Sequence, residues 1–293
     1  MTVRPPSRLI RVVETDAHEG PVYAADEPAL YFTSLPPGAA VKRLALDGGH
    51  LRRDASDVSV LRADANGANG MTLAPDGRLL VCEQGSLTDA ARLTLVDRRT
   101  GAAEVVVDGV GGRPLNSPND VVVKSDGTIW FTDPSYGFLQ GFRPRPQLGD
   151  VVYRHDPATG GTTVVADGFD KPNGLAFSPD ERVLYVGDSG APQRLDAFDV
   201  AGDGRGLTGR RRLAPIAPGT PDGIEVDADG RVYACAAAGV QVLAPDGEPL
   251  GLLELPGAVN LTWGGAARDV LFITADSAIW AAVGDDTPEH EEA

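Results

Sequence analysis

Oxygen-bearing side chains recur along this chain at nearly constant intervals. The six positions, which we call the anchors, are Glu19, Asn69, Asn119, Asn173, Asp222 and Asn260. Successive anchors are separated by 50, 50, 54, 49 and 38 residues, and four of them are followed directly by glycine. Their side chains offer only carboxylate and amide oxygens, which are the ligands of hard divalent cations such as Ca²⁺. A fold that brought the anchors together would therefore create a cation site.

Each anchor opens a repeated unit that is typical of antiparallel strands. In the copy that begins at Asn119, two apolar runs flank a turn in VVVKSDGTIWFTD. Asp-Gly pairs at 76–77, 126–127 and 229–230 stand between two such runs and indicate tight hairpin turns. A third and a fourth apolar run follow, such as Val151–His155 and Thr162–Asp167. Four short strands in about 40–50 residues are typical of one propeller blade.

Six such units predict an all-β protein, a six-bladed β-propeller with four antiparallel strands per blade. The last unit has a third run, Ser277–Val283, but too few residues for a fourth. An apolar run, Arg8–Val13, precedes the first anchor. We expect this N-terminal run to close the ring as the outer strand of the last blade, because an open edge invites aggregation. The prediction is one domain, residues 1–284, followed by a disordered acidic tail, 285–293. The alternative of two separate domains finds no linker.

The propeller topology would bring the six anchors together at one end of the central channel. The first strand of each blade lines the central channel, so all six anchors should lie on one rim around the axis. The second strand returns to the same rim and ends in Glu83, Asp133 and Asp188, which should form a second ring. Glu19 and Asp222 would repel each other there unless a cation lay between them. The simpler alternative is that each anchor-Gly pair only makes a turn, but six copies on one axis favour the cation site.

The composition and net charge of the chain limit the classes of partner that it can bind. The chain has 293 residues with 26 Lys and Arg against 42 Asp and Glu, a net charge of −16. This charge disfavours nucleic acid and anionic membranes, which need basic patches. Neither an apolar run of about 18 residues nor a signal-peptide pattern is visible, so we expect a soluble cytoplasmic protein.

Cys82 and Cys235 are predicted to be free thiols on second strands of the second and fifth blades. Monomer and dimer both remain open.

Longer stretches around the anchors resemble the gluconolactonase and regucalcin (senescence marker protein) family. The resemblance is carried by NSPND at 116–120 and WFTDPSYG at 130–137. The family's other signature positions match in order at EGP (19–21), NGL (173–175) and PDG (221–223). It extends over roughly Arg8 to Val283 and implies a six-bladed propeller with one divalent cation in its central funnel.

The resemblance also implies roles for individual residues. It places Glu19, Asn173 and Asp222 on the cation, and Asn119 either on the cation or on the substrate. Ca²⁺ is the favoured ion, with Mg²⁺, Mn²⁺, Zn²⁺ and Fe²⁺ as alternatives. We expect the substrate to contact Asn69, Asn119, Tyr136 and Ser117. Ser117 stands where the animal sugar-lactonase branch of the family carries an arginine.

The leading hypothesis is a metal-dependent lactonase, gluconolactonase-like, that acts on a small-molecule lactone. The metal would polarise the lactone carbonyl, and a carboxylate or a metal-bound hydroxide would activate water. Asp222 is the first candidate for the general base and Asp133 the second. Two alternatives stay open: a phosphotriesterase or aryl-esterase that uses the same site, and a non-catalytic calcium-binding propeller scaffold.

Overall fold

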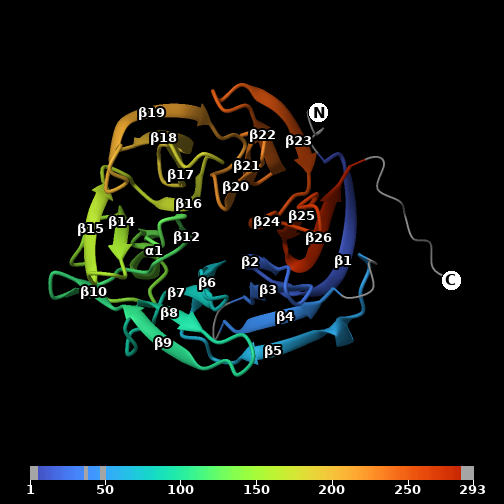
Figure 1. The fold of residues 1–293 in the computed structure, drawn as a ribbon, viewed down its shortest axis with the longest axis horizontal. Helices are drawn as coiled ribbons and strands as arrows, with labels where there is room; N and C mark the ends of the chain where they lie inside the picture. The colour runs from blue at the N-terminus through green and yellow to red at the C-terminus, as the bar shows by residue number, and fades with distance from the viewer. Residues whose placement is uncertain (1–5, 36–38, 47–50, 285–293) are drawn as a thin grey trace.

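Six four-stranded antiparallel sheets surround a central axis in the computed structural model, which describes residues 6–35, 39–46 and 51–284 (Figure 1). The predicted all-β six-bladed propeller is therefore confirmed. Within the described residues the helical elements are one short helix, α1 (Tyr136–Leu139), and one 3₁₀ turn, η1 (Ala55–Asp57). The predicted acidic tail, 285–293, lies outside the described residues.

In each blade the strands run from the axis outward, and in five blades this is also the chain order. Blade 1 contains β2 (Glu19–Ala24), β3 (Ala29–Thr33), β4 (Val41–Ala45) and β5 (Val58–Arg62). Blade 2 contains β6 (Ala68–Leu73), β7 (Leu79–Glu83), β8 (Arg92–Val96) and β9 (Ala103–Val107). Blade 3 contains β12 (Val121–Val123), β13 (Ile129–Asp133), β14 (Val151–Asp156) and β15 (Gly161–Ala166). A two-stranded hairpin, β10 (Gly109–Val110) and β11 (Arg113–Pro114), lies between blades 2 and 3 in the chain.

The second half of the ring repeats this plan. Blade 4 contains β16 (Pro172–Phe177), β17 (Val183–Asp188), β18 (Arg194–Val200) and β19 (Leu207–Pro215). Blade 5 contains β20 (Ile224–Val226), β21 (Val232–Ala236), β22 (Gly239–Leu243) and β23 (Pro249–Glu254). Blade 6 contains β24 (Asn260–Gly264), β25 (Val270–Thr274) and β26 (Asp276–Val283), with β1 (Arg8–Ala17) outermost.

The N-terminal strand closes the ring, as predicted. β1 pairs antiparallel with β26, so that Arg8 lies opposite Val283 and Ala17 opposite Asp276. Figure 1 shows β1 along the outer edge of blade 6. Val12 and Val13 are buried in a cluster that joins blades 6 and 1. The first and last strands of the chain therefore share one sheet, and β26 has no open edge.

The core lies between neighbouring blades. Every residue of β3, β7, β13, β21 and β25 is buried, because these second strands are covered by a blade on each side. Cys82 on β7 and Cys235 on β21 are buried and unpaired, which confirms the predicted free thiols.

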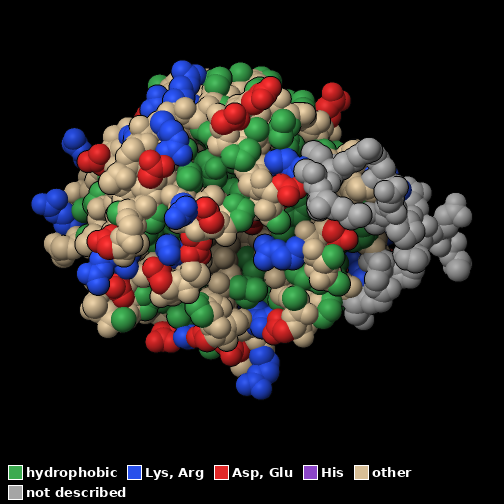
Figure 2. Space-filling model, turned by 45° about the horizontal axis from the view of Figure 1, so that its top comes forward, with side chains coloured by type: hydrophobic (Ala, Val, Ile, Leu, Met, Phe, Trp, Pro, Cys, Tyr) green, Lys and Arg blue, Asp and Glu red, His purple; other side chains and the backbone are tan. Residues whose placement is uncertain are grey.

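The surface mixes both charges. Figure 2 shows Lys and Arg side chains interspersed with Asp and Glu side chains over the visible face. In the part of the chain that the structure describes, no helix has the length and apolarity needed to cross a membrane.

Candidate active site

The structure brings the anchors together where the inner strands begin. Glu19 and Asn260 are 241 residues apart in the chain, yet Glu19 Oε2 accepts a hydrogen bond of 2.6 Å from Asn260 Nδ2. Asp222 lies close enough to the side chains of Asn173 and Glu19 for both to lower its pKa. Five anchors are 4–7% exposed, and Asp222 is half-buried. The predicted convergence on the axis is therefore observed.

A closed ring of hydrogen bonds holds the anchors in register. At every junction between blades, one donor reaches a main-chain carbonyl at or beside the next anchor. Three donors are threonine hydroxyls at the ends of second strands: Thr33 to Asn69 (3.2 Å), Thr132 to Asn173 (2.8 Å) and Thr274 to His18 (2.8 Å). The other three are glycine amides: Gly70 to Asn119 (2.8 Å), Gly174 to Asp222 (3.2 Å) and Gly223 to Val259 (2.9 Å).

This ring explains the glycine that follows four of the anchors. A Cβ atom on Gly70 would lie 2.5 Å from the Asn119 carbonyl oxygen, and one on Gly174 would lie 2.3 Å from that of Asp222. A Cβ on Gly223 would meet Asn260 Oδ1 at 2.3 Å. The glycines thus allow neighbouring inner strands to approach closely, so the reading of these pairs as simple turns is insufficient.

Two carboxyls, those of Glu19 and Asp222, interact electrostatically at this site. The pKa of Glu19 is raised well above its usual range, first by burial and then by the negative charges of Asp222 and Asp120. Burial raises the pKa of Asp222 to about 6, while the His18 ring and the hydrogen bonds from Asn173 and Glu19 act in the opposite direction. Without a cation, burial and the nearby negative charge thus make it unfavourable for both carboxyls to be ionised together.

The same residues fit a divalent cation. Asn69 Oδ1 and Asn119 Oδ1 are buried and have no hydrogen-bond partner among the described residues. Amide oxygens without partners, beside two carboxyls that cannot both ionise alone, form an oxygen-only donor set of the kind that Ca²⁺ prefers. Within the described residues no three His, Cys, Asp or Glu side chains gather as a metal site, so the amides of Asn119 and Asn173 would have to complete the set.

The sequence analysis did not identify two further acids near the axis, Asp120, which is buried, and Glu225, which is half-buried. Burial raises the pKa of Asp120 and that of Glu225 to about 7 each, and the charges of Glu225 and Asp222 add to the effect on Asp120. The signal for Asp120 was its place directly after Asn119, where four other anchors are followed by glycine. Glu225 carried no signal beyond lying three residues after Asp222.

The second ring lies behind the anchors and supports the segments that lead to them. Glu83, Asp133 and Asp188 are fully buried at the ends of β7, β13 and β17. Asp133 accepts the amides of Asn116 and Ser117, both at 2.9 Å. Asp188 accepts the amides of Asp170 (3.1 Å) and Lys171 (2.8 Å). Glu83 binds Asn66 (3.0 Å), Thr94, Arg62 and Arg92. Each acid thus accepts hydrogen bonds from residues that lie two or three positions before the anchor of its own blade.

Of the predicted substrate contacts, Tyr136 and Ser117 differ in position. Tyr136 begins α1, and its hydroxyl lies 3.5 Å from Asn173 Nδ2, so it borders the anchors. Ser117 is fully buried, and its hydroxyl donates to the Pro134 carbonyl (2.6 Å) and accepts the Gly137 amide (3.0 Å). The Ser117 hydroxyl therefore fixes the turn that carries Tyr136.

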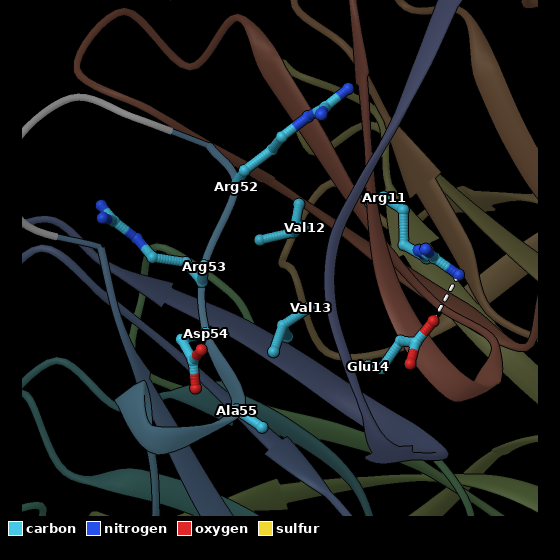
Figure 3. A pocket seen from close by; sticks show the side chains of 8 residues that line it. All are labelled: Arg11, Val12, Val13, Glu14, Arg52, Arg53, Asp54 and Ala55. Carbon is cyan, nitrogen blue, oxygen red and sulfur yellow. Dashed lines mark ion pairs between the residues drawn. The ribbon is translucent and has the colours of Figure 1, made fainter. Parts of the chain in front are cut away.

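A hollow of about 500 Å³ lies elsewhere, between β1 and the segment before η1 (Figure 3). It is lined by Arg11, Val12, Val13, Glu14, Arg52, Arg53, Asp54 and Ala55. Arg11 and Glu14 pair at 2.5 Å, and both side chains are more than half exposed. This hollow lies on the outermost strand of blade 6 and includes none of the anchors.

Comparison with known proteins matches nearly the whole chain. A family model described as "SMP-30/Gluconolactonase/LRE-like region" matches residues 17–277. A gluconolactonase from Zymomonas mobilis is 33% identical over 270 residues, which cover 85% of this chain and 73% of that protein. Lactonohydrolase oryL from Aspergillus oryzae is 30% identical over an alignment that covers 89% of this chain and 66% of that protein. The solved structure of a gluconolactonase from Xanthomonas campestris superposes with a TM-score of 0.82 at 33% identity, covering 95% of this chain and 94% of that one.

Proposed function

Because the chain belongs to the SMP-30/gluconolactonase/LRE-like family, we propose that it is a metal-dependent lactone hydrolase whose active site is the anchor ring. The observation that carries the proposal is the pair of facing carboxyls, Glu19 and Asp222, beside buried amide oxygens without partners. The names of the relatives, gluconolactonase and lactonohydrolase, support a lactone as the substrate class. Two free thiols support the expected cytoplasmic location.

Glu19, Asn119, Asn173 and Asp222 would hold one divalent cation. Ca²⁺ suits this set best, because all four ligands are oxygens and two of them are neutral amides. When bound, the cation supplies Lewis acidity toward the lactone carbonyl. With the cation bound, both carboxyls would be ionised, so cation binding would release protons.

The chain's own residues would then orient the lactone and move the proton. The anchor Asn69, whose Oδ1 has no partner among the described residues, and Tyr136, which borders the anchors, are suited to bind substrate hydroxyls. Asp222 accepts a proton from the attacking water, whose oxygen bonds to the carbonyl carbon. The bond between that carbon and the ring oxygen breaks, and the ring oxygen takes the proton from Asp222. The product is the open hydroxy acid.

The test is a substrate panel measured with and without a chelator. Lactone opening at neutral pH releases a proton, so a pH indicator follows it for aldonolactones, while chromogenic leaving groups report phosphotriesters and aryl esters. We expect rapid lactone turnover that stops with chelator and returns with Ca²⁺. Preferred turnover of a phosphotriester or aryl ester would assign the site to another esterase. Tight Ca²⁺ binding without turnover of any substrate would indicate a binding scaffold.

A further inference from the structure

Arg143 is a buried arginine that the proposed chemistry does not use. It lies in the 17-residue connection between β13 and β14 and is 6% exposed. Its guanidinium donates to four main-chain carbonyls, those of Asn116 (2.9 Å), Leu115 (3.2 Å), Ser86 (2.7 Å) and Asp89 (2.7 Å). Arg143 forms none of the ion pairs observed among the described residues. Burial of an unpaired guanidinium is costly, and its planar fork suits several acceptors at once.

Arg143 and Asp133 bind opposite edges of the segment that leads to Asn119. Arg143 binds the carbonyls of Leu115 and Asn116. Asp133 binds the amides of Asn116 and Ser117. The peptide units at 115–117 are thus held by a guanidinium on their carbonyl side and by a buried carboxyl on their amide side. Asn119 follows two residues later, and its amide donates to the carbonyl of Thr132 (2.9 Å), the neighbour of Asp133.

The stem of Arg143 fixes a second part of the site. It packs on Gly137 so closely that a Cβ there would lie 2.2 Å from Arg143 Cγ. Gly137 directly follows Tyr136 in α1. The head of the same side chain reaches the loop after β7 through Ser86 and Asp89. One side chain therefore sets the relative positions of α1, the segment before Asn119 and the neighbouring blade.

We propose that Arg143, acting with Asp133, is a positioning residue that holds Asn119 and Tyr136 in the geometry of the active site. This inference rests on the proposed function for its kinetic consequence. The guanidinium of Arg143 is occupied by main-chain carbonyls, so its effect passes through the 115–117 segment. It also assigns Asp133 a positioning duty, because a fully buried carboxylate with both oxygens occupied by amides is poorly placed to take a proton from water.

The test compares Arg143→Lys with Arg145→Lys, an exposed arginine in the same connection. Lysine keeps the charge but cannot span carbonyls of two blades. For Arg143→Lys we expect hydrogen exchange at residues 115–119 to quicken about tenfold. We expect the calorimetric Kd for Ca²⁺ to rise about fivefold or more, and kcat/KM for the best lactone to fall about tenfold or more. Arg145→Lys should leave all three quantities within about twofold.

Two further variants separate positioning from general destabilisation. Val13→Ala in β1 lowers stability far from the site, so its Ca²⁺ Kd and KM should stay unchanged below its melting temperature. Gly137→Ala places a methyl group where the Arg143 stem lies, so it should reproduce the Arg143→Lys pattern even if that variant does not fold. Unchanged exchange and Ca²⁺ affinity in both Arg143→Lys and Gly137→Ala would overturn the proposal. A wild type without lactonase activity would refute the proposed function, while the exchange measurement would still decide the role of Arg143.

Discussion

Glu19 and Asp222 are two carboxyls in one buried site, and their roles differ. In our account both bind the cation, but only Asp222 also accepts a proton from water. Asp222→Asn keeps one oxygen ligand and removes the basicity, so turnover at saturating metal should fall by about 10²–10⁴-fold. Glu19→Gln removes only a ligand charge, so its activity should follow metal occupancy and recover at high Ca²⁺. Rates and bound metal are measured on the same preparations. Full activity of Asp222→Asn at saturating metal would show that Asp222 is only a ligand.

A variant of Glu225 measures how much free energy of unfolding is lost when an acid near the axis is ionised. Its folded pKa is raised by burial to about 7, although the charge of Arg268 opposes the shift. A raised folded pKa favours the folded state below the unfolded pKa of about 4.3, and that advantage is lost as pH rises through about 7. In chelator, Glu225→Gln should therefore be more stable than wild type at pH 8 by about 1 kcal/mol or more, with a smaller gain at pH 5.

Thermal melts at the two pH values measure this difference, and 1 kcal/mol corresponds to about 2 °C or more for a chain of this size. Glu248→Gln, at an exposed turn of the same blade, serves as the control. An equal gain for Glu225→Gln at pH 5 and pH 8 would contradict the burial of an ionisable group.

The sequence indicated the anchors and the second ring of Glu83, Asp133 and Asp188, but not the role of Arg143. The anchors repeat with a regular spacing, so their convergence could be predicted once a ring of blades was assumed. Arg143 lies in a connection that does not recur along the chain, so no repeated spacing marks it. Its partners are main-chain carbonyls, which every sequence has. The substrate contact expected for Ser117 stays a prediction. The structure shows that its hydroxyl binds Pro134 and Gly137, contacts that no spacing encodes.

At the scale of elements, β1 is the strand on which the ring depends. It covers β26 and buries Val12 and Val13 between blades 6 and 1. Val13→Asp places a charge in that cluster and should cost about 3 kcal/mol or more, which lowers the melting temperature by about 6 °C or more. Glu14→Gln, one residue away on the exposed face, should change the melting temperature by about 1 °C at most. Equal effects of the two variants, followed by circular dichroism, would refute closure through β1.

The strands themselves were predictable because alternating apolar runs and Asp-Gly turns are local signals. Gly77, Gly127 and Gly230 adopt φ values of +82°, +82° and +83°, as those turns require. The connection at 134–150 was not predictable in the same way. Its single helical turn, α1, has no apolar period, and its position is set by contacts with another blade through Arg143.

At the scale of the whole molecule, the site exists only when the ring is complete. Glu19 meets Asn260 across 241 residues, and the six hydrogen bonds between blades join each blade to the next. A cation bound by residues of several blades should therefore stabilise the entire fold. At about 100 times its Kd a ligand adds about 2.7 kcal/mol, so Ca²⁺ should raise the melting temperature of chelated protein by about 5 °C. An unchanged melting curve at millimolar Ca²⁺ would contradict a site that bridges blades.

We propose that one cation, held by the anchors, enables this chain to hydrolyse a lactone. Chelated protein is titrated with Ca²⁺ while bound metal per chain and the rate of lactone hydrolysis are recorded on the same samples. We expect a rate near zero without metal, a linear rise with occupancy and a plateau at one cation per chain. Full lactonase activity in metal-free protein, or a plateau at a different stoichiometry, would contradict it.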